Sequence, residues 1–154
     1  MSSHEVLAKR ARWRLWGGLL LLSMALASRA EDRRFGDYVV HYSLFQSSFL
    51  QPSIAHAYAI VRARDRAVLT IAVRRDSEQP AGEAVGATIS GTRGDLIYSR
   101  ALDLREIREE QAIYYLADFE FISGEAIYFE LSIRPDGEPG TLSLQFNQTL
   151  YADR

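Results

Sequence analysis

Two histidines are the first candidates for chemistry, because imidazole is the commonest metal ligand and titrates near neutral pH. His41 and His56 are the histidines that follow residue 30. A zinc or copper site would need both of them and a carboxylate such as Asp37. Their spacing matches no recognised ligand pattern, and a histidine in the middle of a strand is more often a half-buried residue with a backbone partner. Metal binding through these residues is therefore the alternative function, and we expect no resident cofactor.

Acidic and hydroxyl side chains are the next candidates, because hydrolysis by general acid and base needs two carboxyl groups in different environments. The acidic residues that lie close together in the sequence are explained equally well by solvated turns and outward strand faces. Ser90 and Ser123 lack the G-x-S-x-G context of a nucleophilic serine. No catalytic residue is assigned, and the pattern favours a protein that is not an enzyme. The acidic pairs are Glu109 with Glu110, Asp118 with Glu120, and Asp136 with Glu138.

Tyrosines suggest a binding surface, since a phenol offers contact area together with a polar group. Tyr114, Tyr128 and Tyr151 fall on the strand faces that we expect to point outward. Strands favour tyrosine whatever they bind, so β propensity explains these residues equally simply. The three tyrosines are the candidate binding surface predicted from the sequence.

Residues 112–151 contain the clearest structural signal, because apolar and polar side chains alternate through three runs separated by two turn-forming clusters. Successive side chains of a strand point to opposite faces, so each run has one apolar face. The pattern predicts an antiparallel meander of three neighbouring strands. Its shared apolar face has to be covered, and a second sheet is the expected cover.

The preceding residues follow the same alternating pattern. Strands are predicted over 37–45, 67–75 and 83–91, with further strand material at 96–98 and 101–107. A short helical turn is expected near residues 53–58, capped by Ser53, with Ile54, Ala57 and Tyr58 facing inward. About seven strands with turns at roughly ten-residue intervals predict an all-β fold, an antiparallel two-sheet sandwich of immunoglobulin-like type. A closed barrel is the alternative, because alternation does not reveal whether a sheet closes on itself.

The first 30 residues have the composition of a secretory signal peptide. A basic segment from Lys9 to Arg14 precedes the apolar run Leu15–Ala27, and small residues at Ser28 and Ala30 suit a signal peptidase. The apolar run is shorter than the roughly 20 residues that cross a bilayer. We expect cleavage after Ala30, in preference to Ala27, which leaves residues 31–154 as one β-sandwich domain in the bacterial periplasm.

Charge and composition exclude several classes of protein. Of 154 residues, 47% are hydrophobic and 25% charged, as in a folded globular protein, and none is cysteine, so disulfides and thiolate metal sites are excluded. Five of the 18 basic and one of the 20 acidic residues lie in residues 1–30, which leaves a formal net charge of −6 on the remainder. An acidic domain is repelled by phosphate backbones, so we expect no nucleic-acid partner. No membrane span is expected after signal removal.

Three segments resemble a known family: residues 35–43 (FGDYVVHYS), the connection Phe49–Pro52, and residues 105–119 (REIREEQAIYYLADF). They are similar to domain of unknown function 4426, a family of small secreted proteins of gammaproteobacteria. The resemblance implies a periplasmic β-sandwich over essentially all of residues 31–154, and it implies no activity and no functional residues. The function predicted here is a non-enzymatic module that binds a periplasmic protein or small ligand through a strand edge or a tyrosine-bearing sheet face.

Overall fold

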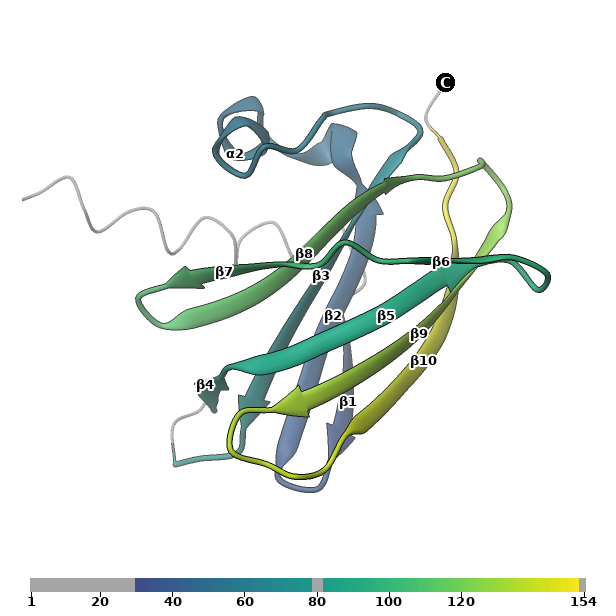
Figure 1. Ribbon diagram of the computed structural model, residues 1–154. Helices are drawn as coiled ribbons and strands as arrows, with labels where there is room; N and C mark the ends of the chain where they lie inside the picture. Colours follow the sequence, from purple (N-terminus) through teal and green to yellow (C-terminus); the bar gives the residue numbers. More distant parts are fainter. Residues whose placement is uncertain (1–29, 79–81, 153–154) are drawn as a thin grey trace, which may run out of the picture.

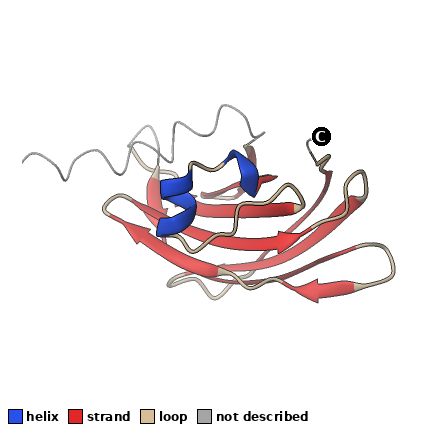
Figure 2. Ribbon diagram, turned by 90° about the horizontal axis from the view of Figure 1, so that it is seen from above, coloured by secondary structure: helices blue, strands red, loops and turns tan. Residues whose placement is uncertain are grey.

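The computed structural model describes residues 30–78 and 82–152, so the predicted signal peptide lies outside the described residues except for Ala30. Within this part of the chain no helix is long and apolar enough to cross a membrane. The described residues form two antiparallel sheets that pack face to face, with short helical segments at one end (Figure 1, Figure 2). The predicted two-sheet sandwich is confirmed, and the strands of residues 30–78 and 82–152 do not close into a barrel.

Sheet A contains six strands and sheet B four. The order in sheet A is β1-β2-β3-β8-β7, with β4 paired to the end of β3, and the order in sheet B is β10-β9-β5-β6. The strands of sheet A are β1 (Glu31–Phe35), β2 (Tyr38–Gln46), β3 (Arg66–Arg75), β4 (Glu83–Val85), β7 (Arg105–Glu109) and β8 (Ala112–Glu120). Those of sheet B are β5 (Ala87–Gly94), β6 (Ser99–Ala101), β9 (Ala126–Pro135) and β10 (Leu142–Thr149). The described strands exceed the expected seven because several are only three to five residues long.

The core lies between the sheets and is built by strict alternation along the long strands. Alternate side chains of β2 and β3 are buried on the face toward sheet B, and they pack against the inner face of β9. The fully buried side chains of Leu69, Ile71, Phe129, Leu131 and Ile133 occupy the centre. Burying a large apolar side chain contributes about 1.5–3 kcal/mol relative to leaving it exposed, so this double layer holds the sandwich together.

The predicted meander over residues 112–151 is wrong in its pairing. β8 pairs with β3 and β7 in sheet A, whereas β9 and β10 pair in sheet B. The turn after β8 therefore carries the chain from one sheet to the other. Local alternation identified the three strands, but the choice of neighbour depends on contacts with β3 and β5, which are distant in sequence.

Two further connections pass between the sheets. β4 continues into β5 through Gly86, and β6 is linked to β7 by residues 102–104 (Figure 1). β7 is short because the chain, after crossing from sheet B through residues 102–104, first pairs with β8 where Arg105 lies opposite Leu116. On the side of the sandwich next to β6 and the end of β8, the described part of the chain consequently forms no continuous strand.

The short helical turn is confirmed as α2 (Pro52–Ala57), which follows the 3-10 turn η2 (Ser47–Phe49). The predicted cap is wrong: Gln51 is the N-cap residue and makes no side-chain cap, while Pro52 opens the helix with its preset φ. Ile54 and Tyr58 face inward as predicted and are partly buried, whereas Ala57 is exposed and Ala55 is the buried residue. The helix therefore begins two residues earlier than a cap at Ser53 would place it.

Candidate functional site

The predicted metal ligands are spread along β2 and beyond it. Asp37 precedes β2, His41 lies within it, and His56 is exposed on α2, after the far end of the strand. Nine residues of strand span about 26 Å, so Asp37 and His56 lie near opposite ends of sheet A. His41 Nδ1 lies 2.6 Å from Asp32 Oδ1 on the neighbouring strand β1. In residues 30–78 and 82–152 no three histidine, aspartate or glutamate side chains are grouped to hold a metal ion.

Several of the carboxylates considered for catalysis are engaged by neighbours within the fold. Asp118 Oδ1 and Oδ2 accept hydrogen bonds from Arg105 and Arg66 at 2.8 and 2.6 Å. The Tyr58 hydroxyl donates to Glu109 at 2.7 Å, and burial followed by this contact raises the pKa of Tyr58 to about 12. Glu138 accepts a hydrogen bond from Tyr38 at 2.8 Å. These contacts fit structural ion pairs and loop ends, and none of them joins two carboxyl groups.

The three tyrosines predicted to form a binding surface are divided between the sheets. Tyr114 belongs to β8 of sheet A, Tyr128 belongs to β9 of sheet B, and Tyr151 follows β10. The two strand tyrosines lie on opposite sides of the sandwich, because each points away from the shared core. Tyr114 and Tyr128 therefore do not form one surface.

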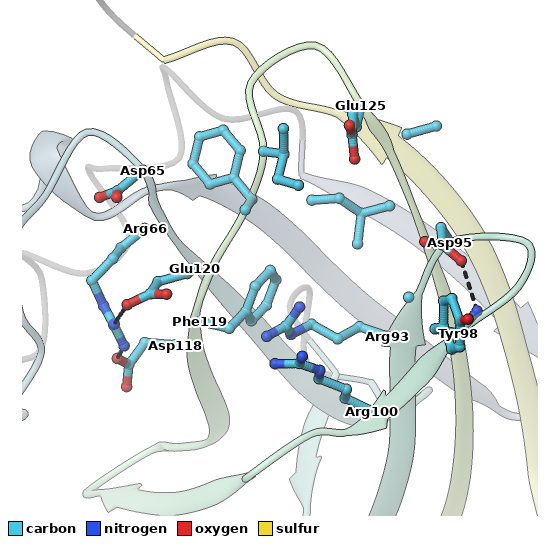
Figure 3. A pocket seen from close by; sticks show the side chains of 15 residues that line it. Asp65, Arg66, Arg93, Asp95, Tyr98, Arg100, Asp118, Phe119, Glu120 and Glu125 are labelled. Atoms are coloured by element: carbon cyan, nitrogen blue, oxygen red, sulfur yellow. Dashed lines mark hydrogen bonds and ion pairs between the residues drawn. The ribbon is translucent and has the colours of Figure 1, made fainter.

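The structure instead reveals a hollow of about 710 Å³ on the open side of the sandwich, which we call the edge pocket. One wall is the start of β3 together with residues 118–122 of β8 and its following turn. The other wall is the end of β5 and the hairpin that leads into β6. Figure 3 shows charged side chains from both sheets around this hollow. The edge pocket lies on the side of the sandwich that β7 and the connection from β6 to β7 leave uncovered.

Two arginines of sheet B point into the edge pocket. Arg93 continues the inward phase of β5 that begins with Ala87, and Arg100 is its direct cross-strand partner on β6. The Arg93 guanidinium carbon lies 4.3 Å from the ring centroid of Phe119, and in Figure 3 both guanidinium groups point toward β8. Within the described part of the chain neither arginine forms an ion pair. The inner face of sheet B thus ends in two unpaired cations.

The surroundings of Arg93 disfavour its charge. Burial lowers the pKa of the Arg93 guanidinium, Arg100 and Arg66 lower it further, and Glu120 acts in the opposite direction. Like charges directly opposite each other on neighbouring strands also destabilise a sheet. A ligand with a negative group would relieve both effects.

The carboxylates around the edge pocket do not neutralise these two arginines. Asp118 and Glu120 pair with Arg66, and Asp95 accepts hydrogen bonds from the amides of Ile97 and Tyr98, both at 2.7 Å. Those backbone hydrogen bonds lower the pKa of Asp95. Asp65 and Glu125 are exposed at the rim, where water and salt screen them. The unpaired positive charge therefore belongs to the wall formed by sheet B.

An apolar rim borders the same pocket. Tyr98 and Ile122 line the pocket and are 74% and 64% exposed, and Leu96 and Ile97, at the tip of the β5–β6 hairpin before Tyr98, are 83% and 80% exposed. The strand predicted at residues 96–98 is wrong, because the Asp95 side chain binds the two following amides and closes a turn. Exposed apolar side chains gathered in one place mark interaction sites.

Comparison with known proteins places the chain in a family. The model of a domain of unknown function, DUF4426, matches residues 32–153. The chain belongs to the DUF4426 family. A solved DUF4426 family protein from Pseudomonas aeruginosa PAO1 is 33% identical in sequence, with a TM-score of 0.69 over 81% of this chain and 97% of that one. No curated protein matches the chain.

The DUF4426 sandwich also resembles more distant structures. FetP of uropathogenic Escherichia coli strain F11, expressed in the periplasm of E. coli, is 12% identical with a TM-score of 0.56, over 82% of this chain and 97% of that one. A copper-bound E46Q variant of FetP is 12% identical with a TM-score of 0.55, over 82% and 93% of the two chains. At this level of identity the likeness extends to the fold alone.

Sequence reasoning did not identify the two arginines of this DUF4426 protein. The predicted strand ended at Gly91, where a turn was expected, although the alternation of Val85, Ala87 and Ile89 continues in phase to Arg93. Extending that period by one more pair of residues would have placed an arginine on the inner face. The pairing of Arg93 with Arg100 depends on the hairpin and became visible only in the fold.

Proposed function

We propose that this DUF4426 protein is a secreted periplasmic binding module without enzymatic activity, which takes an anionic group of its ligand in the edge pocket. Arg93 and Arg100 hold that group, and Phe119, Tyr98 and Ile122 contact the apolar part of the ligand. The observation that carries the proposal is the pair of inward-facing arginines without an ion-pair partner in the described residues.

Folding alone does not account for this arrangement. An apolar residue at position 93 would continue the core of β5, whereas the arginine brings a desolvated charge opposite a second arginine. Positions where a local rule of stability is broken are frequently functional sites. Guanidinium groups bind carboxylate and phosphate oxygens through paired, charge-assisted hydrogen bonds, which suits an anionic ligand.

The periplasmic location rests on the N-terminal sequence. A basic segment, an apolar run and small residues at 28 and 30 are typical of a cleaved signal. The fold shared with FetP, which was expressed in the periplasm, is compatible with that location. Intact-mass analysis of protein recovered from a periplasmic extract should give a chain that begins at Glu31. A full-length chain retained in the cytoplasm would contradict secretion.

Titration with simple anions tests the pocket. We expect succinate and inorganic phosphate to shift the arginine side-chain NMR signals of Arg93 and Arg100 in residues 31–154, with saturation. Arg93→Gln and Arg100→Gln should each weaken the interaction at least tenfold. Arg134→Gln is the matched control, because Arg134 is an exposed arginine on the outer face of the same sheet. Equal weakening by all three substitutions, or no saturable shift, would overturn the proposal.

Metal binding through His41 and His56, with Asp37, is the second candidate. What supports it is the fold that the chain shares with the copper-bound FetP variant. The two histidines lie on separate elements, and His41 is already paired with Asp32. A copper titration, described in the Discussion, distinguishes this candidate from the anion site.

A further inference from the structure

The backbone of β8 provides a second recognition feature beside the two arginines. β7 pairs with β8 only as far as Arg105 opposite Leu116, whereas β8 continues to Glu120. On its other side β8 is paired with β3 up to Glu120 opposite Arg66. The last residues of β8 thus form a strand edge that β7 does not cover.

Alternation of the backbone shows which groups face this edge. The two-residue turn between Glu109 and Ala112 makes these residues a hydrogen-bonded pair, so the even-numbered residues of β8 turn their amide and carbonyl groups toward β7. At the far end, the Phe121 amide donates to the Asp65 carbonyl at 2.8 Å, so odd-numbered residues face β3. The amides and carbonyls of Asp118 and Glu120 therefore point away from β3, and within the described chain they have no backbone partner.

The edge pocket runs along this free edge. Five consecutive residues, 118–122, line it, which corresponds to about 13 Å of extended chain. A strand added here would lie end to end with β7, as β4 and β8 lie end to end along β3. Its residue opposite Phe119 would share the inward face of β8, and its side chain would point toward the guanidinium groups over that ring.

We infer that the ligand of the edge pocket is an extended polypeptide segment that pairs with the free edge of β8 and places an acidic side chain opposite Phe119, between Arg93 and Arg100. The inference rests on the proposed anion site and names its occupant. Main-chain hydrogen bonds to Asp118 and Glu120 supply affinity, and the two arginines select the acidic residue. The exposed side chains of Tyr98 and Ile122 contact the apolar neighbours of that residue.

The arginines would also limit which segments can pair with this edge. Inward-pointing charges are a common protection of open strand edges, because they repel apolar and like-charged segments. Arg93 and Arg100 would leave a desolvated cation beneath any added strand that lacks a carboxylate. Specificity then comes from the penalty on wrong segments as much as from the attraction of the right one.

The test uses a nine-residue peptide with blocked ends, with glutamate at the centre, valine two residues to either side and threonine elsewhere. We expect saturable binding to residues 31–154 by calorimetry, and slower hydrogen exchange at the amides of Asp118 and Glu120 in the complex. Replacing the central glutamate by glutamine should weaken binding at least tenfold. Methylating the two threonine amides that flank the glutamate should do the same, because these amides face β8 in antiparallel pairing.

A matched pair of variants tests the edge in the protein. Glu120→Gln and Glu120→Pro both remove the charge of an exposed side chain, and only the proline removes the amide that faces the pocket. We expect Glu120→Gln to retain peptide binding and Glu120→Pro to lose at least tenfold. If the proline variant does not fold, the methylated peptide decides the question with the unaltered protein.

Two results would overturn the inference. A methylated peptide that binds as tightly as its parent would show that the main chain is not recognised, and succinate binding would still support the anion site. A peptide that does not bind at all, in a folded domain that does bind succinate, would show that the occupant is a small anion. Loss of succinate binding as well would refute the proposed function itself.

Discussion

Arg93→Met should make this protein more stable while it removes ligand binding. The substitution eliminates the repulsion between Arg93 and its cross-strand partner Arg100, which is worth about 0.2–1 kcal/mol for like charges directly opposite on a sheet. The cation–π contact with Phe119 is lost, at about 0.5–1 kcal/mol, and a methionine sulfur near the same ring returns about 0.3–1.5 kcal/mol. With desolvation of the guanidinium also relieved, we expect a net gain of about 0.5–1 kcal/mol.

Denaturation of residues 31–154 measures this gain. For a domain of this size the expected change raises the melting temperature by about 2–5 °C. Circular dichroism is the suitable probe, because both tryptophans, Trp13 and Trp16, lie in the predicted signal peptide. Urea titrations should show a higher midpoint with an unchanged slope, since the surface exposed on unfolding hardly changes.

A double-mutant cycle isolates the repulsion. Either substitution removes the repulsion between Arg93 and Arg100. The increases in the free energy of unfolding of Arg93→Met and Arg100→Met should therefore sum to about 0.2–1 kcal/mol more than the increase in the double variant. Destabilisation of Arg93→Met by more than about 1 kcal/mol would refute the reasoning. Arg93 would then be a structural residue whose charge the fold requires, and the proposal that the edge pocket binds a ligand would lose its main support.

Three further predictions concern other parts of the molecule. Asp118→Ala should lower the free energy of unfolding by about 1–3 kcal/mol in urea titrations. Asp118 is 17% exposed, and its loss leaves the guanidinium groups of Arg66 and Arg105 without their shared acceptor. Glu130→Ala, which removes an exposed carboxylate of β9, is the control, and an equal loss of stability in it would contradict this prediction. The Tyr58 pKa of about 12 lies above the ordinary value near 10, so the stability that depends on the neutral phenol is complete below pH 10 and is lost as the pH rises toward 12. The stability difference between the natural protein and Tyr58→Phe should accordingly shrink between about pH 10 and pH 12, and a constant difference would show that Tyr58 titrates normally. In copper titrations of residues 31–154 we expect no stoichiometric binding that depends on His41 and His56, since Asp37 and His56 lie near opposite ends of β2. Binding of one equivalent of copper that is lost in both His41→Ala and His56→Ala would instead establish the metal site.

The alternating pattern alone was sufficient to predict the long strands and the core. In β3 and β9 apolar residues recur with a period of two, and this period identifies the face that packs against the other sheet. A segment such as Ala126–Pro135 therefore carries its own burial pattern. The two-sheet sandwich follows, because three or more strands with an apolar face need a second layer to cover it.

Strand partners were not predictable in the same way. The turn after Glu120 is compatible with a hairpin within one sheet, and only contacts between β8 and β3, about 50 residues apart, direct the chain to the other sheet. The helix start was missed for a local reason, because Pro52 at the first helical position outweighed the capping preference of Ser53.

The sequence by itself determined the predicted secretion signal, the acidic cysteine-free composition and the inward faces of β3 and β9, because each depends on neighbouring residues alone. Only the tertiary structure decided which of the polar and aromatic side chains lie together. It separated Tyr114 from Tyr128, separated His56 from Asp37, and brought Arg93, Arg100 and Phe119 together at an uncovered strand edge. The physical reason is that a site is made by pairing and crossing of distant segments, and strand pairing is set by the packing of the whole sandwich.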